Sequence, residues 1–368
     1  MRPHGAFRLF VTAICAAGLL SSAGAASAAG RQAKKPAPKT PPASQSKPSS
    51  TKAKPTVAKP TVTKSGSTRT SVARARSAAR AKAAAAARQQ REASSPRFKR
   101  DALGNLVPDV RAAAAIVFNP QTGEVLWEEN SHETRSIASL TKIMTAVTFV
   151  ADDPDMNQQV LITRADTANA SVTHLRTGDL VTWGDLLHLT LIASDNAAAR
   201  ALARTAEGGT TAFVGRMNDM ARQLGLTNTH YLDPSGLVAA NVSSAYDMSH
   251  LIAFAATDAR IGSVMRTADY VVRTPRREIR IHSTNKLLST DIDVRGGKTG
   301  FISKAGYCLA TLLQIPQGSQ VAVVVLGAAN SATRFWEARH LFNWVVGKAQ
   351  GIIGTDDARP APAAASIR

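Results

Sequence analysis

The chain has 368 residues and a formal net charge of +19, a balance that on its own would suggest a nucleic-acid partner. The charge is unevenly placed. Residues 1–100 contain 21 of the 45 lysines and arginines and one acid, Glu92, whereas residues 101–368 contain 24 basic and 25 acidic side chains. The larger part of the chain is therefore nearly neutral. No aromatic residues are interleaved with the basic charges of 31–97, so nucleic-acid binding is disfavoured.

The N-terminus has the pattern of a secretory signal peptide over residues 1–28. Arg2 and Arg8 flank the start of an apolar run, 9–20, which ends in the small-residue segment SSAGAASAAG, and Ala26–Ala28 gives an A-x-A cleavage site. The run is too short for a membrane span, and no later segment approaches about 20 consecutive apolar residues. We therefore expect an exported, periplasmic protein that is soluble or peripherally associated with the envelope.

Residues 29–107 are predicted to form a disordered basic tether, because Ala, Pro, Ser, Thr, Lys and Arg dominate and large apolar side chains are rare. Such a tether is expected to associate with anionic polymers or lipids of the envelope; a solubilising spacer is the alternative. Residues 349–368 are predicted to be a disordered C-terminal tail. A single domain over residues 108–348 remains, which is large enough for one apolar core.

The first half of this domain changes from strands to helices. Two β-like runs flank a turn with Pro and Gly, which predicts a hairpin within 112–130. Apolar residues at helical spacing follow from Leu140 onward. Residues 182–208 predict two helices interrupted at 194–196, where the residue types favour caps and turns. Another helix is predicted over 210–226.

The second half is richer in β-branched residues. After a helix predicted around 246–256, the segments 270–281, 294–313 and 319–329 alternate as strands do, and an amphipathic helix covers 332–349. Helices in the middle with strands at both ends predict an α+β domain. The first hairpin is expected to join the late strands in one antiparallel sheet, packed against a helical cluster with the site at their junction.

Ser139 and Lys142 stand three residues apart at the start of the first predicted helix, so their side chains can meet. A serine hydroxyl is a weak nucleophile and needs a base within hydrogen-bonding reach. Lys142 can be that base only when neutral, which requires burial or a nearby positive charge such as Lys298. The helix N-terminus favours negative charge developing on the Ser139 oxygen. The spacing alone proves little, because Ser-x-x-Lys occurs at three other places in the chain.

Two further motifs follow in order. Ser194-Asp195-Asn196 lies at the predicted helix junction, and Lys298-Thr299-Gly300 lies on a β-like run. Each pattern also occurs elsewhere, as Ser283-Thr284-Asn285 and as Lys64-Ser65-Gly66, so neither is specific alone. In this order and placement, the three motifs resemble the set found in penicillin-binding proteins and β-lactamases.

The later motif residues each have a chemical task. Ser194 can relay a proton between Lys142 and the leaving group. The Asn196 amide can both donate and accept hydrogen bonds to a substrate backbone. Lys298 and Thr299 can hold a carboxylate.

Backbone groups are expected to complete the site. The oxyanion of an acyl-transfer intermediate is predicted to lie between N–H groups, for which those of Ser139 and Phe301 are the best candidates. Gly300 lets substrate backbone lie close against the strand, because it has no side chain.

No metal or other cofactor is expected. The eight histidines, including His132, His174 and His230, have no H-E-x-x-H or comparable ligand spacing. Cys308 is the one cysteine that remains after signal-peptide removal, and it is predicted to be a small buried apolar residue rather than a reactive thiol.

The sequence around the motifs also resembles that of a known family. The resemblance lies in the segments IASLTKIMTA, LLHLTLIASDNAAARALA, NTHYLDPSGL, STNKLL and GGKTGFISKAGYCLA. Over nearly all of 110–345 the chain resembles low-molecular-mass penicillin-binding proteins of the D-alanyl-D-alanine carboxypeptidase and endopeptidase family. This implies a β-lactamase/transpeptidase-like fold, peptidoglycan peptide stems or cross-links as substrate, and β-lactams as covalent inhibitors. It implies Ser139 as acyl-ester nucleophile and Lys142 as general base. It also implies Ser194 as the second proton-transfer serine and Lys298 as the anchor of the substrate carboxylate and transition state.

The segment GKTGFISKAGYCL is most similar to the endopeptidase branch, the penicillin-binding protein 7 type, which implies cleavage of D-alanyl to diaminopimelate cross-links. The carboxypeptidase branch typically has a second β-rich domain and a C-terminal amphipathic membrane helix, and this chain ends too soon for either. The bond that is cut depends on groove shape rather than on the motifs, so carboxypeptidase activity stays open.

Two alternatives come from other functional classes. A class A β-lactamase shares all three motifs, but its rapid deacylation needs a glutamate after the second motif, and this chain has no glutamate between Glu207 and Glu278. Asp233 lies in that interval, within a DPSGL turn that the peptidase family shares. A non-catalytic peptidoglycan-binding module with a polyanion-binding tail is disfavoured by the intact motif set. We therefore expect β-lactams to acylate Ser139 and to remain there.

Overall fold

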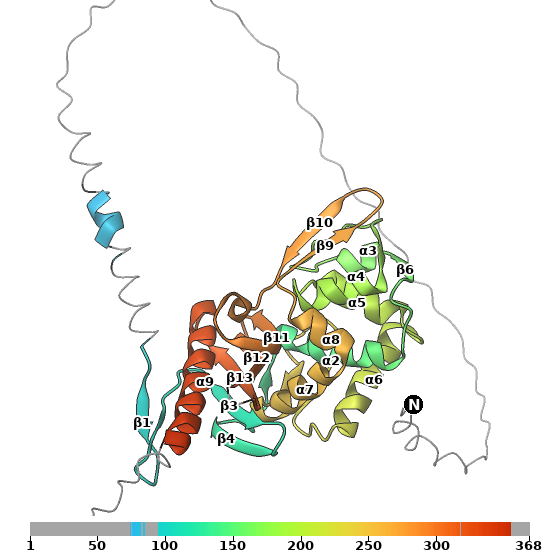
Figure 1. Ribbon diagram of the computed structural model, residues 1–368. Helices are drawn as coiled ribbons and strands as arrows, with labels where there is room; N and C mark the ends of the chain where they lie inside the picture. Colours follow the sequence, from blue (N-terminus) through green and yellow to red (C-terminus); the bar gives the residue numbers. More distant parts are fainter. Residues whose placement is uncertain (1–73, 75, 82–83, 85–94, 317, 355–368) are drawn as a thin grey trace, which may run out of the picture. The chain divides into compact units, whose positions relative to one another are not determined.

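All described residues of the computed structural model belong to the second of the chain's two units, which begins at Gly66. They are residues 74, 76–81, 84, 95–316 and 318–354 (Figure 1). The predicted signal peptide, most of the predicted tether and the end of the C-terminal tail lie outside them. Among the described helices, none combines the length and the apolarity that crossing a membrane requires.

A five-stranded antiparallel sheet forms the centre of the domain (Figure 1). Its strands are β3 (Ala114–Asn119), β4 (Glu124–Glu129), β11 (Asp293–Ile302), β12 (Gly306–Gln314) and β13 (Gln320–Ala328). Their order is β11-β12-β13-β3-β4, with every neighbouring pair antiparallel. The predicted union of the first hairpin with the late strands is confirmed.

The strand β13 explains why both faces of this sheet are covered. Successive side chains of a strand point to opposite faces. Ala322 and Val324 belong to the apolar core shared with the helical cluster, whereas Val323 and Val325 belong to a second core shared with the helix α9 (Ser331–Gly354). The domain therefore has three layers, a helical cluster, the sheet and α9.

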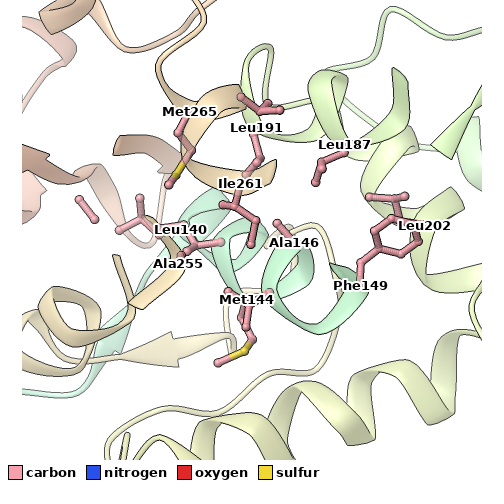
Figure 2. Packing of buried hydrophobic residues seen from close by; sticks show 14 of the residues in the cluster. Leu140, Met144, Ala146, Phe149, Leu187, Leu191, Leu202, Ala255, Ile261 and Met265 are labelled. Carbon is pink, nitrogen blue, oxygen red and sulfur yellow. The ribbon is translucent and has the colours of Figure 1, made fainter. Parts of the chain in front are cut away.

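The helical cluster is built around one buried helix, α2 (Thr141–Ala151), in which every residue from Thr141 to Val150 is buried. Figure 2 shows Phe149 of α2 beside Leu202 and places Leu187 and Ile261 around the same helix. The surrounding helices are α3 (Arg164–Thr167), α4 (Trp183–Leu191), α5 (Asn196–Thr205), α6 (Gly209–Gln223), α7 (Ala245–Thr257) and α8 (Ala259–Met265). Together with the sheet, this confirms the predicted α+β class.

Short elements connect these layers. They are the strand pairs β5 (Arg135–Ser136) with β8 (Val242–Ser243) and β6 (Gln159–Leu161) with β7 (Leu180–Thr182), and the 3₁₀ turns η1 (Ala138–Leu140) and η2 (Lys286–Ser289). The predicted break between α4 and α5 is present, and Asp195 causes it by accepting a hydrogen bond from the backbone N–H of Ala198 at 3.0 Å.

The segment 270–281 does not join the main sheet, contrary to our expectation. Its strands β9 (Asp269–Arg273) and β10 (Glu278–His282) pair only with each other. Val272 and Ile279, which are register partners, are buried against the apolar core, whereas the opposite face carries charged side chains. A strand pair with one charged face cannot be inserted between buried strands, so it stands apart as a hairpin.

The predicted limits of disorder also need correction. Residues 98–108, expected to lie mostly in the tether, form the strand pair β1 (Phe98–Arg100) and β2 (Leu106–Pro108). The Asp101 carboxylate closes the connecting turn by accepting hydrogen bonds from the backbone N–H groups of Leu103 and Asn105, at 2.9 and 2.8 Å. The prediction of disorder rested on the average composition of 29–107, which does not reveal a single turn of this kind. At the other end, α9 continues to residue 354 rather than ending near 348.

Candidate active site

Ser139 lies in η1, which leads directly into α2. Two backbone segments enclose this turn. A Cβ atom added to Gly236 would lie 2.1 Å from the carbonyl oxygen of Ala138, and one added to Gly300 would lie 2.8 Å from that of Ile137. Because no side chain fits in either place, the nucleophile is held between the 233–236 turn and β11. We expected the absence of a side chain at Gly300 to make room for a substrate backbone. In the structure, the backbone of Ile137 already occupies that space.

Left-handed backbone marks the same region. Ala138 has φ +49° and Ser194 has φ +58°, conformations that residues other than glycine rarely adopt. Each costs on the order of 1 kcal/mol or more and persists only where the surrounding structure imposes it. Both residues directly flank catalytic groups, so this strain belongs to the construction of the site.

Lys142 is fully buried and is surrounded by oxygen atoms. Its Nζ atom lies 3.1 Å from Ser139 Oγ and 2.5 Å from Asn196 Oδ1, and it also donates to the carbonyl oxygen of Ser235. A neutral amine has two N–H bonds and one lone pair. With the N–H groups given to Asn196 and Ser235, the lone pair is left for the proton of the Ser139 hydroxyl.

The pKa of Lys142 is lowered to about 7, mainly by burial and also by the positive charge of Arg200, against the opposing effect of Asp195 and Asp233. Lys142 is therefore neutral in a large fraction of molecules near pH 7. The sequence suggested Lys298 as the neighbouring positive charge, and Arg200 is a further one that no sequence pattern singled out.

Lys298 is also buried, and its Nζ donates to the Thr299 carbonyl oxygen at 2.8 Å. Burial lowers the pKa of Lys298 well below its ordinary value, and repulsion from Lys142 lowers it further. A carboxylate bound beside Lys298 would favour its charged form.

Ser194, Thr299, Gly300 and Phe301 all line a cavity of about 440 Å³ together with Ser139. These motif residues are therefore brought together from η1, the α4–α5 junction and β11, whereas Lys142 and Lys298 are buried behind the residues that line the cavity. The Ser194 hydroxyl makes no hydrogen bond within the described part of the chain, and its half-exposed side chain is available to a bound substrate.

Asn196 has a different position from the expected one. It lines the cavity, but its Oδ1 accepts from Lys142 and its Nδ2 donates to the Ala170 carbonyl oxygen at 2.6 Å, with only 3% of the residue exposed. One amide hydrogen and one oxygen lone pair remain for a substrate. The first task of Asn196 is therefore to position Lys142.

Sequence reasoning missed three groups at the cavity. Arg334 of α9 donates to the Gly300 carbonyl oxygen at 3.0 Å and lines the cavity. Thr284 accepts a hydrogen bond from Thr299 Oγ1 at 2.7 Å. It belongs to Ser283-Thr284-Asn285, which lies in the segment STNKLL of the family resemblance but was assigned no role in the site. The backbone of Ser235 completes the contacts of Lys142.

Cys308 is completely buried on β12, and burial raises the pKa of its thiol to about 11. The prediction that it is an unreactive core residue is confirmed. A large hollow elsewhere, about 460 Å³ between Phe98 and the Trp336 and Trp344 side chains of α9, contains no residue of the three motifs. The chemistry therefore belongs to the cavity at Ser139.

This fold and site define a serine hydrolase in which a buried lysine lies within hydrogen-bonding distance of the candidate nucleophile. A family model described as Peptidase S11, D-alanyl-D-alanine carboxypeptidase, matches residues 101–330. The chain belongs to this family of serine D-alanyl-D-alanine peptidases, so the resemblance noted in the sequence is confirmed.

Individual relatives agree with this assignment. A D-alanyl-D-alanine endopeptidase of Pseudomonas aeruginosa is 32% identical over 245 residues, which cover 65% of this chain and 79% of that protein. The D-alanyl-D-alanine carboxypeptidase DacC of Escherichia coli is 35% identical over 255 residues, 64% of this chain and 62% of that protein. The crystal structure of the Streptomyces K15 DD-transpeptidase matches with a TM-score of 0.61 at 29% identity, covering 64% of this chain and 97% of that one. The predicted transpeptidase-like fold is confirmed.

Proposed function

We propose that the chain hydrolyses D-alanyl peptide bonds of peptidoglycan through an acyl-enzyme on Ser139. One observation carries the proposal, the 3.1 Å contact between Ser139 Oγ and the Nζ atom of Lys142, a buried lysine with a pKa of about 7. A base whose pKa lies near the working pH is efficient at proton transfer. Relatives named for endopeptidase and for carboxypeptidase activity support the same bond class.

In the acylation step, neutral Lys142 takes the hydroxyl proton of Ser139 as Oγ attacks the D-alanyl carbonyl carbon. The backbone N–H groups of Ser139 and Phe301 stabilise the oxyanion. The tetrahedral intermediate collapses as the peptide C–N bond breaks, and the proton passes from Lys142 through the Ser194 hydroxyl to the leaving amine. Water then attacks the ester and regenerates the free serine.

Lys298 and Thr299 are proposed to hold the substrate carboxylate. Because the pKa of Lys298 is lowered by burial, binding of a carboxylate should be accompanied by uptake of a proton. Titration calorimetry in two buffers of different ionisation enthalpy measures this uptake. A binding enthalpy that is the same in both buffers would contradict the role of Lys298.

We propose cross-link cleavage, the endopeptidase reaction, as the favoured activity. The test is digestion of purified cross-linked muropeptides, in which conversion of dimers to monomers is compared with release of terminal D-alanine. Release of D-alanine without dimer conversion would assign the chain to carboxypeptidase activity instead.

β-Lactams are proposed to acylate Ser139 and to stay bound, since no carboxylate that acts on Lys142 within the described residues is free to activate the deacylating water. Two acids raise the pKa of Lys142, and both already have other partners. Asp195 accepts the capping hydrogen bond of α5, and Asp233 accepts a hydrogen bond within the 233–236 turn. A fluorescent penicillin should label the wild type persistently. Equal labelling of Ser139→Ala would refute acylation at this serine.

Export and tail binding are part of the same proposal. The sequence pattern of residues 1–28 supports a cleaved signal peptide, which cell fractionation and N-terminal sequencing of the mature protein would test. The net charge of +20 in residues 1–100 supports contact of the tail with anionic lipids or polymers of the envelope.

A further inference from the structure

The hairpin β9–β10 presents an unusual concentration of positive charge on an almost neutral domain. Four exposed arginines lie on it and on the adjacent loop, and we refer to them as the arginine rim. The arginine rim consists of Arg176, Arg273, Arg276 and Arg280. Glu278 is the acid nearest to it, at 3.4 Å from Arg273 and 3.5 Å from Arg280. Arg176 and Arg276 form no ion pair with any residue in the described ranges.

Neighbouring acids offset the arginine rim only in part. Arg277 is mostly buried and forms an ion pair with Asp179 at 2.7 Å, and the Asp269 carboxylate contacts the exposed His282. Glu278 is shared by two arginines of the rim, so the other two have no acidic partner among the described residues. The arginines of the rim do not stabilise the core, because all four are exposed.

The hairpin that carries most of the arginine rim is connected to the catalytic cavity. Ser171 and Val172, which line the cavity, lead into His174, whose backbone N–H donates to the Asp195 carboxylate of the second motif at 2.5 Å. Arg277 at the tip of the hairpin donates to the carbonyl oxygen of His174 at 2.7 Å. The hairpin is thus fixed to the loop that forms one wall of the cavity.

The other end of the hairpin reaches the cavity as well. After β10 the chain runs directly into Thr284, which lines the cavity and accepts the hydrogen bond of Thr299. A substrate segment that leaves the cavity on this side passes over the hairpin, which projects from the domain beside α3 and α4 (Figure 1).

We propose that the arginine rim binds the carboxylates of an acidic peptide segment of the substrate, beyond the D-alanyl residue that is cleaved. This inference rests on the proposed function, because the segment must be part of a molecule whose D-alanyl bond enters the cavity. Arginine suits this task, since its planar guanidinium matches a carboxylate in a bidentate geometry. Exposed charges of this kind act mainly on capture of the substrate and are weakened by salt.

The test compares two variants with equal loss of charge. The rim variant carries R176Q, R273Q, R276Q and R280Q. The control variant carries R100Q, R222Q, R295Q and R339Q, which lie on β1, α6, β11 and α9. For cleavage of an acidic muropeptide dimer at low salt, the rim variant should raise KM about tenfold with kcat unchanged, whereas the control should stay near wild type. The difference should shrink about threefold or more at about 0.5 M salt.

Further measurements distinguish failure of the arginine-rim inference from failure of the proposed function. Acylation by a fluorescent penicillin should be the same in all three proteins, because that small molecule does not reach the arginine rim. Equal KM values for the rim and control variants would overturn the inference. If the rim variant instead loses binding to an anionic wall polymer while its KM is unchanged, the partner is that polymer and the inference is wrong. Penicillin labelling without muropeptide cleavage by the wild type would overturn the proposed function and the inference together.

Discussion

At the scale of single residues, the decisive feature is a lysine that is kept neutral by its surroundings. Lys142 is fully buried, and its two strongest neighbours, Asn196 and Ser235, are acceptors that suit an uncharged amine as well as an ammonium. This explains how a side chain that is normally charged can act as a base near neutral pH.

The rate of acylation should follow the titration of Lys142. The neutral form is active, so the rate of labelling by a fluorescent penicillin should rise with pH through about 7 and level off above about 8. Lys142→Arg should abolish labelling at every pH, because a guanidinium keeps its proton. Labelling measured from about pH 5 to 9 tests this, and a rate independent of pH would contradict the assignment of Lys142 as base.

The same burial should lower stability. A pKa lowered from 10.5 to about 7 corresponds to about 5 kcal/mol against the folded state, a cost that is complete below pH 7 and relieved as the pH rises toward 10.5. Lys142→Met removes this cost together with three hydrogen bonds. We expect it to raise the free energy of unfolding by roughly 1–2 kcal/mol at pH 6.

Denaturant unfolding at pH 6 and pH 10 measures this effect. The gain from Lys142→Met should shrink or reverse at pH 10, where the lysine of the folded protein is neutral and most of the cost of burying its charge is relieved. A gain of the same size at both values would mean that packing, rather than charge, is responsible.

At the scale of elements, the site depends on backbone segments that touch without side chains between them. Gly236 has φ +80° and lies directly against the carbonyl oxygen of Ala138. A methyl group there would displace the nucleophile turn from α2, or displace the 233–236 turn that supplies the Ser235 contact to Lys142.

Gly236→Ala should therefore lower the free energy of unfolding by about 3 kcal/mol or more and abolish penicillin labelling. Gly225→Ala is the matched control, since Gly225 also has positive φ, +70°, but open space around its Cβ position. The control should lose only about 1 kcal/mol and keep its labelling. Equal losses in the two variants would show that backbone strain alone, and not the contact with Ala138, governs this position.

Much of this arrangement could be predicted from periodicity and motif order. The hairpin at 112–130, the broken helix pair and the sheet of first and last strands follow from local patterns, and the order of Ser139, Ser194 and Lys298 identifies the site. The contributions of Arg334 and Thr284 could not be predicted in this way. Both reach the cavity only through tertiary packing, and no motif assigned either of them a role, although Thr284 lies in the STNKLL segment of the family resemblance.

The two errors of element assignment have physical causes as well. Residues 270–281 alternate like sheet strands, but alternation does not identify the partner strand, and their charged outer face prevents insertion into the main sheet. The β1–β2 pair depends on one aspartate turn, Asp101, within a segment whose average composition is that of a disordered chain.

At the scale of the whole molecule, charge and catalysis belong to different parts of the chain. A protein lacking residues 29–94 should keep penicillin labelling, because all motif contacts lie within the described range 95–354. It should lose most of its binding to anionic lipid vesicles at low salt, whereas the full mature chain should bind and be released at about 0.5 M salt. Vesicle co-sedimentation measures this, and equal binding of both proteins would place the membrane contact on the domain instead.

The strand order has a consequence for how activity arises during synthesis of the chain. β3, near the start of the domain, has β13 as one of its two partners, and β13 follows more than 200 residues later. A chain that is made from its N-terminus cannot complete the central sheet until nearly all of it has been synthesised, and pairing across such a separation is slow. An incomplete chain therefore lacks the assembled site around Ser139, and hydrolytic activity arises only in the finished molecule.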